Sequence, residues 1–219
     1  MKKEGKLFTA GVSGLLFVIL IVLVRCVDVA PIGPEGTSIG LSHINQAVFR
    51  LLGFHMTWYK ITTVFGAVTI LTALGFAAFG FLQLLRRRTM QKVDKELVAL
   101  GGLYAVVLVL YILFEKVIIN YRPVIMPGND QPEASFPSTH TMLVCVVMGS
   151  AIMLLGRYIK DDRLCSVLRV ICGLIIAVTV IGRLLSGVHW FTDILGGILI
   201  SITLLAIFSW IIERYRQVK

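Results

Sequence analysis

Residues 7–29 read LFTAGVSGLLFVILIVLVRCVDV, with only two charged side chains, Arg25 and Asp28, both close to the end of the stretch. A helix needs about 20 mostly apolar residues to cross the hydrocarbon core of a bilayer. Lysines precede the stretch, but its apolar core is longer than that of a signal peptide and no Ala-x-Ala-like cleavage site follows it. The stretch therefore predicts a retained first membrane span.

Five further apolar stretches follow the first one. They are residues 61–85, 97–119, 142–158, 164–185 and 191–212. The 219 residues are 57% hydrophobic and 15% charged, against roughly 45–50% and about 25% in soluble domains. The composition excludes a soluble, fibrous or disulfide-stapled secreted protein. It predicts an all-α integral membrane protein with six transmembrane helices, in a single domain over residues 1–219.

The basic residues predict the orientation of the spans. The net charge is +9, but the basic residues gather at the ends of apolar runs instead of on one amphipathic face, so we expect no nucleic-acid partner. With the N-terminus in the cytoplasm, 15 of the 21 Lys and Arg residues fall on the inner side. Because inner loops are enriched in positive charge, we expect both termini to be cytoplasmic.

The connection after the first span has a pattern of its own. Ile44, Ala47, Val48, Leu51 and Leu52 recur at helical spacing, which predicts an amphipathic helix at the membrane interface. It would either brace the bundle or form a lip that guides lipids. We expect His43 and His55 in this connection to be structural.

The four cysteines and three tryptophans do not indicate a site. No Cys-x-x-Cys pair is present, so we expect the cysteines to be small buried hydrophobes, with a disulfide the less favoured alternative. We expect Trp58, Trp190 and Trp210 to lie in the interfacial belt that tryptophans favour.

Three polar clusters lie at the outer ends of spans three to six, where ionisable residues are costly and usually functional. They are Arg122-Pro123, then Pro137-Ser138-Thr139-His140, then Arg183 with His189 and Asp193. His189 and Asp193 are four residues apart and share a helix face, so the carboxylate can fix the tautomer of the imidazole and leave its other nitrogen as a nucleophile or base.

The other members of these clusters suit a phosphate. Arg122 and Arg183 carry planar, permanently charged groups that bind phosphate oxygens in pairs. Pro137 fits the first turn of a helix, whose free N–H groups favour an anion. Two histidines allow one to attack and the other to protonate the leaving oxygen.

These residues resemble the type 2 phosphatidic acid phosphatase family of membrane lipid phosphatases. Its signature reads Lys, six residues, Arg-Pro; then Pro-Ser-Gly-His; then Ser-Arg, five residues, His, three residues, Asp. The second block here is Pro137 to His140, and the third runs from Gly182 to Asp193 with the family spacing. The three blocks lie within residues 116–193.

The resemblance implies a role for each residue. His189 would form a phosphohistidine, with Asp193 orienting it, and His140 would protonate the leaving group and then activate water. Arg122, Arg183, Ser138 and Thr139 would hold the phosphoryl oxygens. The resemblance implies neither a metal nor another cofactor.

The sequence departs from the family pattern at three positions. Gly182 replaces a serine and Thr139 replaces a glycine. Glu115 occupies the position of the family lysine, and Lys116 lies one residue too close to Arg122. Lys116 would reach the phosphate only if its helix ended before Arg122, as the restricted geometry before Pro123 allows; otherwise Glu115 would lie near the site.

Two acidic residues, Asp130 and Glu133, precede the second block. We expect both to be solvated, with substrate screening as the alternative.

Two other classes of function compete with a phosphatase. A zinc hydrolase would use His140, His189 and Asp193 as ligands, but the neighbouring arginines would repel the cation. A transporter or scaffold could keep the bundle without the chemistry.

The sequence thus predicts a bacterial lipid phosphatase of the cytoplasmic membrane, with its site on the extracytoplasmic side. Its substrate would come from the outer leaflet, and its partners would be this lipid and the bilayer. We favour undecaprenyl diphosphate, with phosphatidate, diacylglycerol diphosphate and phosphatidylglycerol phosphate as alternatives. A phosphotransferase with the same site is a further alternative.

Overall fold

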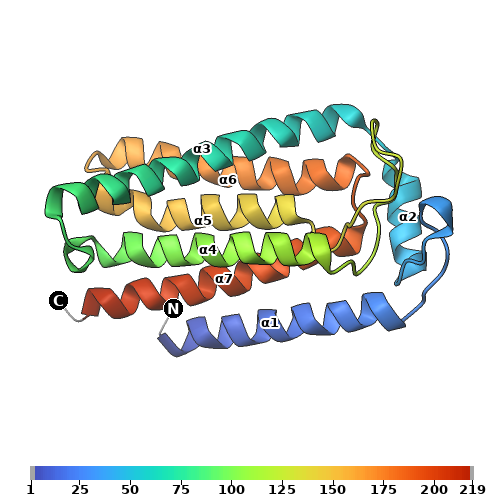
Figure 1. Ribbon diagram of the computed structural model, residues 1–219, viewed down its shortest axis with the longest axis horizontal. Helices are drawn as coiled ribbons and strands as arrows, with labels where there is room; N and C mark the ends of the chain where they lie inside the picture. The colour runs from blue at the N-terminus through green and yellow to red at the C-terminus, as the bar shows by residue number, and fades with distance from the viewer. Residues whose placement is uncertain (1–2, 218–219) are drawn as a thin grey trace.

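The computed structural model describes residues 3–217, which fold into an elongated bundle of helices (Figure 1). The α-helices are α1 (Lys3–Cys26), α2 (Ser42–Leu52), α3 (Met56–Arg87), α4 (Lys95–Lys116), α5 (Thr139–Tyr158), α6 (Asp162–Leu185) and α7 (Phe191–Gln217). Two short 3₁₀ turns, η1 (Pro34–Gly36) and η2 (Met90–Lys92), lie in connections. The described part of the chain has no β-strand, only isolated bridges. The predicted all-α fold is confirmed.

Six of the helices are long and apolar enough to cross a membrane, namely all except α2. They correspond to the six predicted spans. The third is shorter than predicted, because α4 ends at Lys116 instead of continuing to residue 119. The chain leaves the helix there because residues 120–122 pair with residues 133–135 of the following connection.

Helix α5 is the most buried of the spans, and α3, α4, α6 and α7 pack around it. Its residues Met142, Val146 and Leu154 share one buried cluster with Leu100 of α4 and Phe208 of α7. The outward faces of α1, α3 and α4 expose many large apolar side chains, as expected where lipid tails take the place of water. The packing of α5 therefore holds its first residues in a fixed position relative to the neighbouring helices.

Helix α1 packs along α7 and closes the bundle. Ser13 and Thr203 share a hydrogen bond of 2.8 Å between their hydroxyls. Lys6 and Glu213 form an ion pair of 2.8 Å near the two chain ends. Figure 1 shows the described ends of α1 and α7 toward the same end of the bundle, opposite α2.

Helix α2 confirms the helix predicted after the first span, and its contacts show that it braces the bundle. Asp28 accepts hydrogen bonds from the Ser42 hydroxyl at 2.9 Å and the His43 N–H at 2.8 Å, which fixes the start of α2. The side chain of Asn45 is fully buried and exchanges two hydrogen bonds with Thr192 at the start of α7. This bracing holds the first turn of α7 in place.

The cysteines are all free thiols. Cys145, Cys165 and Cys172 are buried, as predicted. Cys26 is exposed, so the expectation of burial was wrong for it. It ends α1, where the chain turns toward Asp28 and no neighbouring helix covers the side chain.

Candidate functional site

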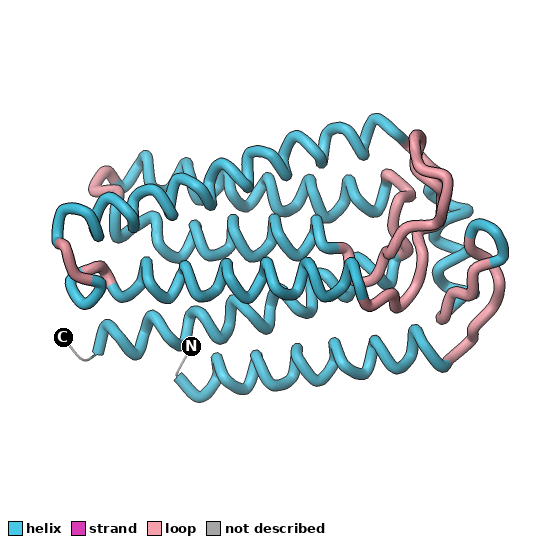
Figure 2. The backbone as a smooth tube through the Cα atoms, viewed as in Figure 1, coloured by secondary structure: helices cyan, strands magenta, loops and turns pink. Residues whose placement is uncertain are grey.

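The residues of the three sequence blocks come from five segments at the end of the bundle that carries α2. His140 lies in the first turn of α5, Arg183 in the last turn of α6, and Asp193 in the first turn of α7. His189 lies in the α6–α7 connection and Arg122 in the long connection between α4 and α5. Figure 2 shows the loops that carry the last two gathered at this end.

The Asp193 carboxylate is the most heavily hydrogen-bonded group at this end. The side chain is fully buried. One oxygen accepts from the Asn120 amide at 3.0 Å, and the other accepts from the Ser135 hydroxyl at 2.5 Å and the Trp190 N–H at 2.8 Å. The main-chain oxygen of Asp193 accepts the Ser138 N–H at 2.9 Å.

Ser135 lies between Asp193 and His189. His189 Nδ1 is 3.7 Å from the Asp193 oxygen, too far for a direct hydrogen bond, but 3.1 Å from Ser135 Oγ. Because the Ser135 hydroxyl donates its proton to the carboxylate, its oxygen accepts from His189 Nδ1–H. This leaves the lone pair on His189 Nε2. If Asp193 orients His189, as predicted, it does so through Ser135, which lies outside the three sequence blocks.

Burial sets the charge of His189. The residue is 5% exposed. Burial lowers the pKa of the His189 imidazole to about 4, against the opposing effect of the Asp193 carboxylate. The imidazole is therefore neutral at pH 7, with an available lone pair.

His140 has the opposite tautomer. Its Nε2 lies 2.8 Å from the main-chain oxygen of Thr62 in α3. A carbonyl oxygen can only accept, so Nε2 carries the proton and the lone pair is on Nδ1. The two histidines therefore use different ring nitrogens for their protein contacts, and each has one nitrogen left for chemistry.

The two arginines are held differently. Arg122 pairs with Glu133 at 3.1 Å, and the Glu133 side chain is 39% exposed, so it is both solvated and paired. The Arg183 guanidinium carbon lies 4.8 Å from the centre of the Tyr59 ring, and its terminal nitrogen is 3.5 Å from the Thr63 hydroxyl. The Nε atoms of both arginines are buried with no acceptor in the described part of the chain. Both therefore have a donor that an anion can satisfy.

The side chain of Ser138 is used by the protein itself. It is fully buried and accepts hydrogen bonds from the Thr141 N–H at 3.4 Å and the Thr141 hydroxyl at 3.0 Å, as an N-cap of α5. Thr139 is the first residue of α5 and is partly exposed. Of the two predicted phosphate ligands, only Thr139 has a side chain without such a local partner.

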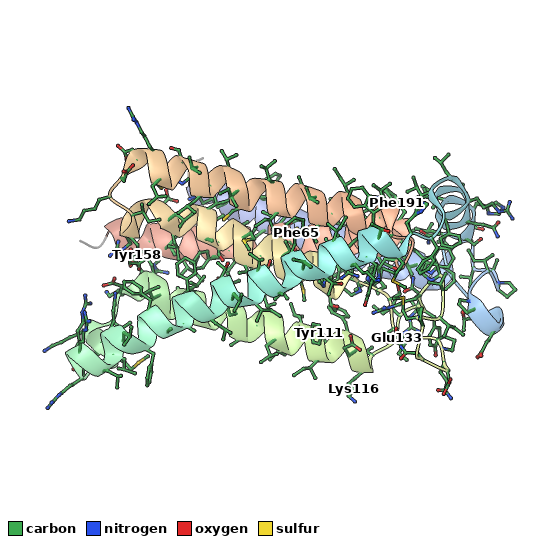
Figure 3. All side chains as sticks on the ribbon, turned by 90° about the horizontal axis from the view of Figure 1, so that it is seen from above. Phe65, Tyr111, Lys116, Glu133, Tyr158 and Phe191 are labelled. Carbon is green, nitrogen blue, oxygen red and sulfur yellow. The ribbon has the colours of Figure 1, made fainter. Side chains whose placement is uncertain are left out.

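Lys116 is not brought to these residues. It ends α4, where it and Glu115 are both exposed. Figure 3 shows its side chain pointing away from the bundle, whereas Glu133 lies among the loops at the site end. The helix does end before Arg122, as a lysine ligand would require, but Lys116 then faces outward.

Gly182, which replaces the family serine, has a packing role. A Cβ atom at this position would lie 2.6 Å from Thr62 Cγ2 and 3.2 Å from Trp58 Cε3. The glycine therefore lets α3 approach α6, which also places the Thr62 carbonyl beside His140.

The remaining candidate ligands are occupied elsewhere. His43 contacts Asp28 at 2.6 Å, and His55 contacts the main-chain oxygen of Leu52 at 2.7 Å. Among the described residues, no group of three or more His, Cys, Asp or Glu side chains could hold a metal ion. The zinc ligand set of the competing hypothesis is therefore not assembled in this part of the chain.

The chain is similar to known proteins in both sequence and fold. Residues 117–217 match the family model of the PAP2 superfamily. The structure matches that of a transmembrane PAP2-type phosphatidylglycerolphosphate phosphatase from Bacillus subtilis, with a TM-score of 0.63 and 20% identity over 94% of this chain and 97% of the other. No curated protein matches the sequence significantly. Residues 117–217 are therefore similar to the PAP2 superfamily, and the chain shares its fold with a transmembrane PAP2 phosphatase.

Proposed function

We propose that the protein is a membrane lipid phosphatase that removes the terminal phosphate of a lipid phosphate or diphosphate through a phosphohistidine intermediate. The observation that carries the proposal is the pairing of two histidines in opposite tautomers with two arginines whose Nε donors are buried and unpaired. In this proposal, these side chains supply the nucleophile, the proton carrier and the charge stabilisers.

In the first step, His189 Nε2 attacks the phosphorus atom while the bond to the leaving oxygen breaks. The imidazole ring becomes positively charged, and the Ser135–Asp193 hydrogen bonds behind Nδ1 stabilise that charge. His140 Nδ1 takes a proton from the bound phosphate monoanion and delivers it to the leaving oxygen. Thr62 holds the other nitrogen of His140 throughout.

In the second step, water attacks the phosphohistidine. His140 Nδ1 accepts the proton of that water, and the bond between phosphorus and His189 Nε2 breaks to give inorganic phosphate. His140 Nδ1 then passes the proton to the departing phosphate, which returns both imidazoles to their neutral forms. Arg122 and Arg183 would stabilise the charge on the equatorial oxygens in both steps. The mechanism that we propose uses no metal ion.

The arrangement of the helices supports a substrate from the outer leaflet. The α3–α4 and α5–α6 connections, which carry basic residues, lie at the end of the bundle opposite α2 (Figure 1), and basic loops favour the cytoplasm. We therefore propose that the site faces outward from the cytoplasmic membrane. We further propose that the lipid tail approaches the site sideways from the bilayer.

The side chains at the site support recognition of the phosphate, not of the tail. Undecaprenyl diphosphate and phosphatidylglycerol phosphate are the first substrates to compare, since the second is named for the structurally similar enzyme. A phosphohistidine could also transfer its phosphoryl group to another alcohol, which would make the protein a phosphotransferase.

Replacing the nucleophile tests the proposal directly. In purified protein in detergent with a chelator present, a panel of lipid phosphates should release phosphate, and His189→Asn should lower kcat by about a thousandfold or more. His43→Asn, which changes an exposed histidine, should retain activity. Rapid quench should trap acid-labile phosphate on the wild-type protein only. Turnover by folded His189→Asn would contradict the proposal.

The pH profile tests the charge of His189. Since only the neutral imidazole can attack, kcat/KM should fall in acid as His189 gains a proton. Because burial lowers its pKa to about 4, we expect the acid limb near pH 4 and not near the ordinary value of about 6.5. An acid limb at or above pH 6.5 that the ionisation of the substrate does not explain would contradict this assignment.

Removing the Ser135 hydroxyl tests the bridge between Asp193 and His189. Ser135→Ala should lower kcat by about 10- to 100-fold, the usual effect of losing an orienting partner, with KM and phosphate inhibition unchanged. Ser201→Ala is the matched control, because this buried hydroxyl donates to main-chain carbonyls in the bundle. An equal loss of kcat in Ser135→Ala and Ser201→Ala would show that the Ser135 effect is structural.

A further inference from the structure

The Glu133 side chain holds the phosphate ligand Arg122, and the backbone alone fixes where Glu133 lies. The Arg122 N–H donates to the Glu133 main-chain oxygen at 3.0 Å, and the Ser135 N–H donates to the Asn120 oxygen at 3.1 Å. Between these bonds, Tyr121 and Ala134 form an antiparallel bridge. The main chain of Glu133 therefore remains next to that of Arg122 whether or not the two side chains are paired.

The pair is asymmetric in its exposure. The Arg122 side chain is 18% exposed, and that of Glu133 is 39% exposed. A terminal guanidinium nitrogen lies 3.1 Å from the carboxylate, while the buried Nε has no acceptor in the described residues. The guanidinium thus lies deeper than the carboxylate and is only partly satisfied by it.

No other acidic side chain in the described residues pairs with the two phosphate-binding arginines. The ion pairs of this part of the chain include none for Arg183. The Asp193 carboxylate is occupied by three donors of its own. Glu133 is therefore the anion that a substrate phosphate would meet at Arg122.

We infer that Glu133 acts as a resident anion, which occupies Arg122 in the empty site and is displaced when a phosphate group binds. The inference rests on the proposed function, which places phosphate at Arg122. A phosphate oxygen and a carboxylate oxygen require the same guanidinium donors, and two anions at one guanidinium repel each other. Phosphate binding is then an exchange of one anion for another.

The exchange of anions at Arg122 also favours release of the phosphate product. A partly exposed ion pair is weak, so an incoming phosphate monoester can displace the carboxylate. After hydrolysis, Glu133 competes with inorganic phosphate for Arg122 and favours its release. Glu133 thus acts through Arg122 as a positioning residue that weakens the binding of every phosphate anion, product included.

Direct binding of inorganic phosphate and of orthovanadate to the purified, full-length protein in detergent tests the inference. Glu133→Gln and Glu133→Ala should bind both anions about three- to tenfold more tightly than wild type, as loss of a weak competing ion pair predicts. The backbone bonds of residue 133 do not involve its side chain, so the thermal unfolding of both variants should match that of wild type. Inhibition of lipid turnover by phosphate should strengthen by the same factor.

Asp130→Asn is the matched control. Asp130 lies in the same connection, is exposed and forms no ion pair among the described residues. Its replacement removes the same charge but should leave anion binding unchanged. An equal gain with Asp130→Asn would overturn the inference in favour of a general charge effect.

Unchanged or weaker anion binding by both Glu133 variants would also overturn the inference, because Glu133 would then merely hold Arg122 in place. If the wild-type protein still hydrolyses lipid phosphates in that case, the inference about Glu133 fails but the proposed function stands. If wild type and all variants neither bind phosphate nor release it from lipids, the proposed function fails as well.

Discussion

The Asp193 carboxylate is fully buried, and three hydrogen-bond donors from two connections satisfy it. A buried charge is tolerated only when such partners surround it. Asn120 and Ser135 bring the α4–α5 connection to the start of α7, and Trp190 brings the α6–α7 connection to the same point. The main-chain bond from Ser138 adds the start of α5. One carboxylate therefore organises the segments that carry both histidines.

The bilayer and the site impose different demands on the same helices. Lipid exposure requires apolar outer faces and self-contained backbone hydrogen bonds, and the spans meet this demand over most of their length. At one end, close packing between α3 and α6 at Gly182 brings the Thr62 carbonyl to His140. The packing of α3 against α6 thus determines which ring nitrogen of His140 faces a substrate.

Periodicity, charge and motif spacing predicted the six spans, the helix after the first span and the clustering of the histidines and arginines at one end. They could not identify Ser135 or Asn120, because a serine and an asparagine in a connection have no spacing rule that ties them to Asp193. Lys116 was a candidate by sequence distance alone, but the exit angle of α4 points it outward. The Arg122–Glu133 pair depends on a loop register that only the structure gives.

A structure of the protein with bound orthovanadate tests the central claim most directly, because vanadate adopts the five-coordinate geometry of phosphoryl transfer. The account predicts vanadium bonded to His189 Nε2, with His140 Nδ1 on the opposite side and the Arg122 and Arg183 guanidinium groups on the equatorial oxygens. Vanadate bonded to another residue, or bound at His189 with His140 out of reach, would contradict it.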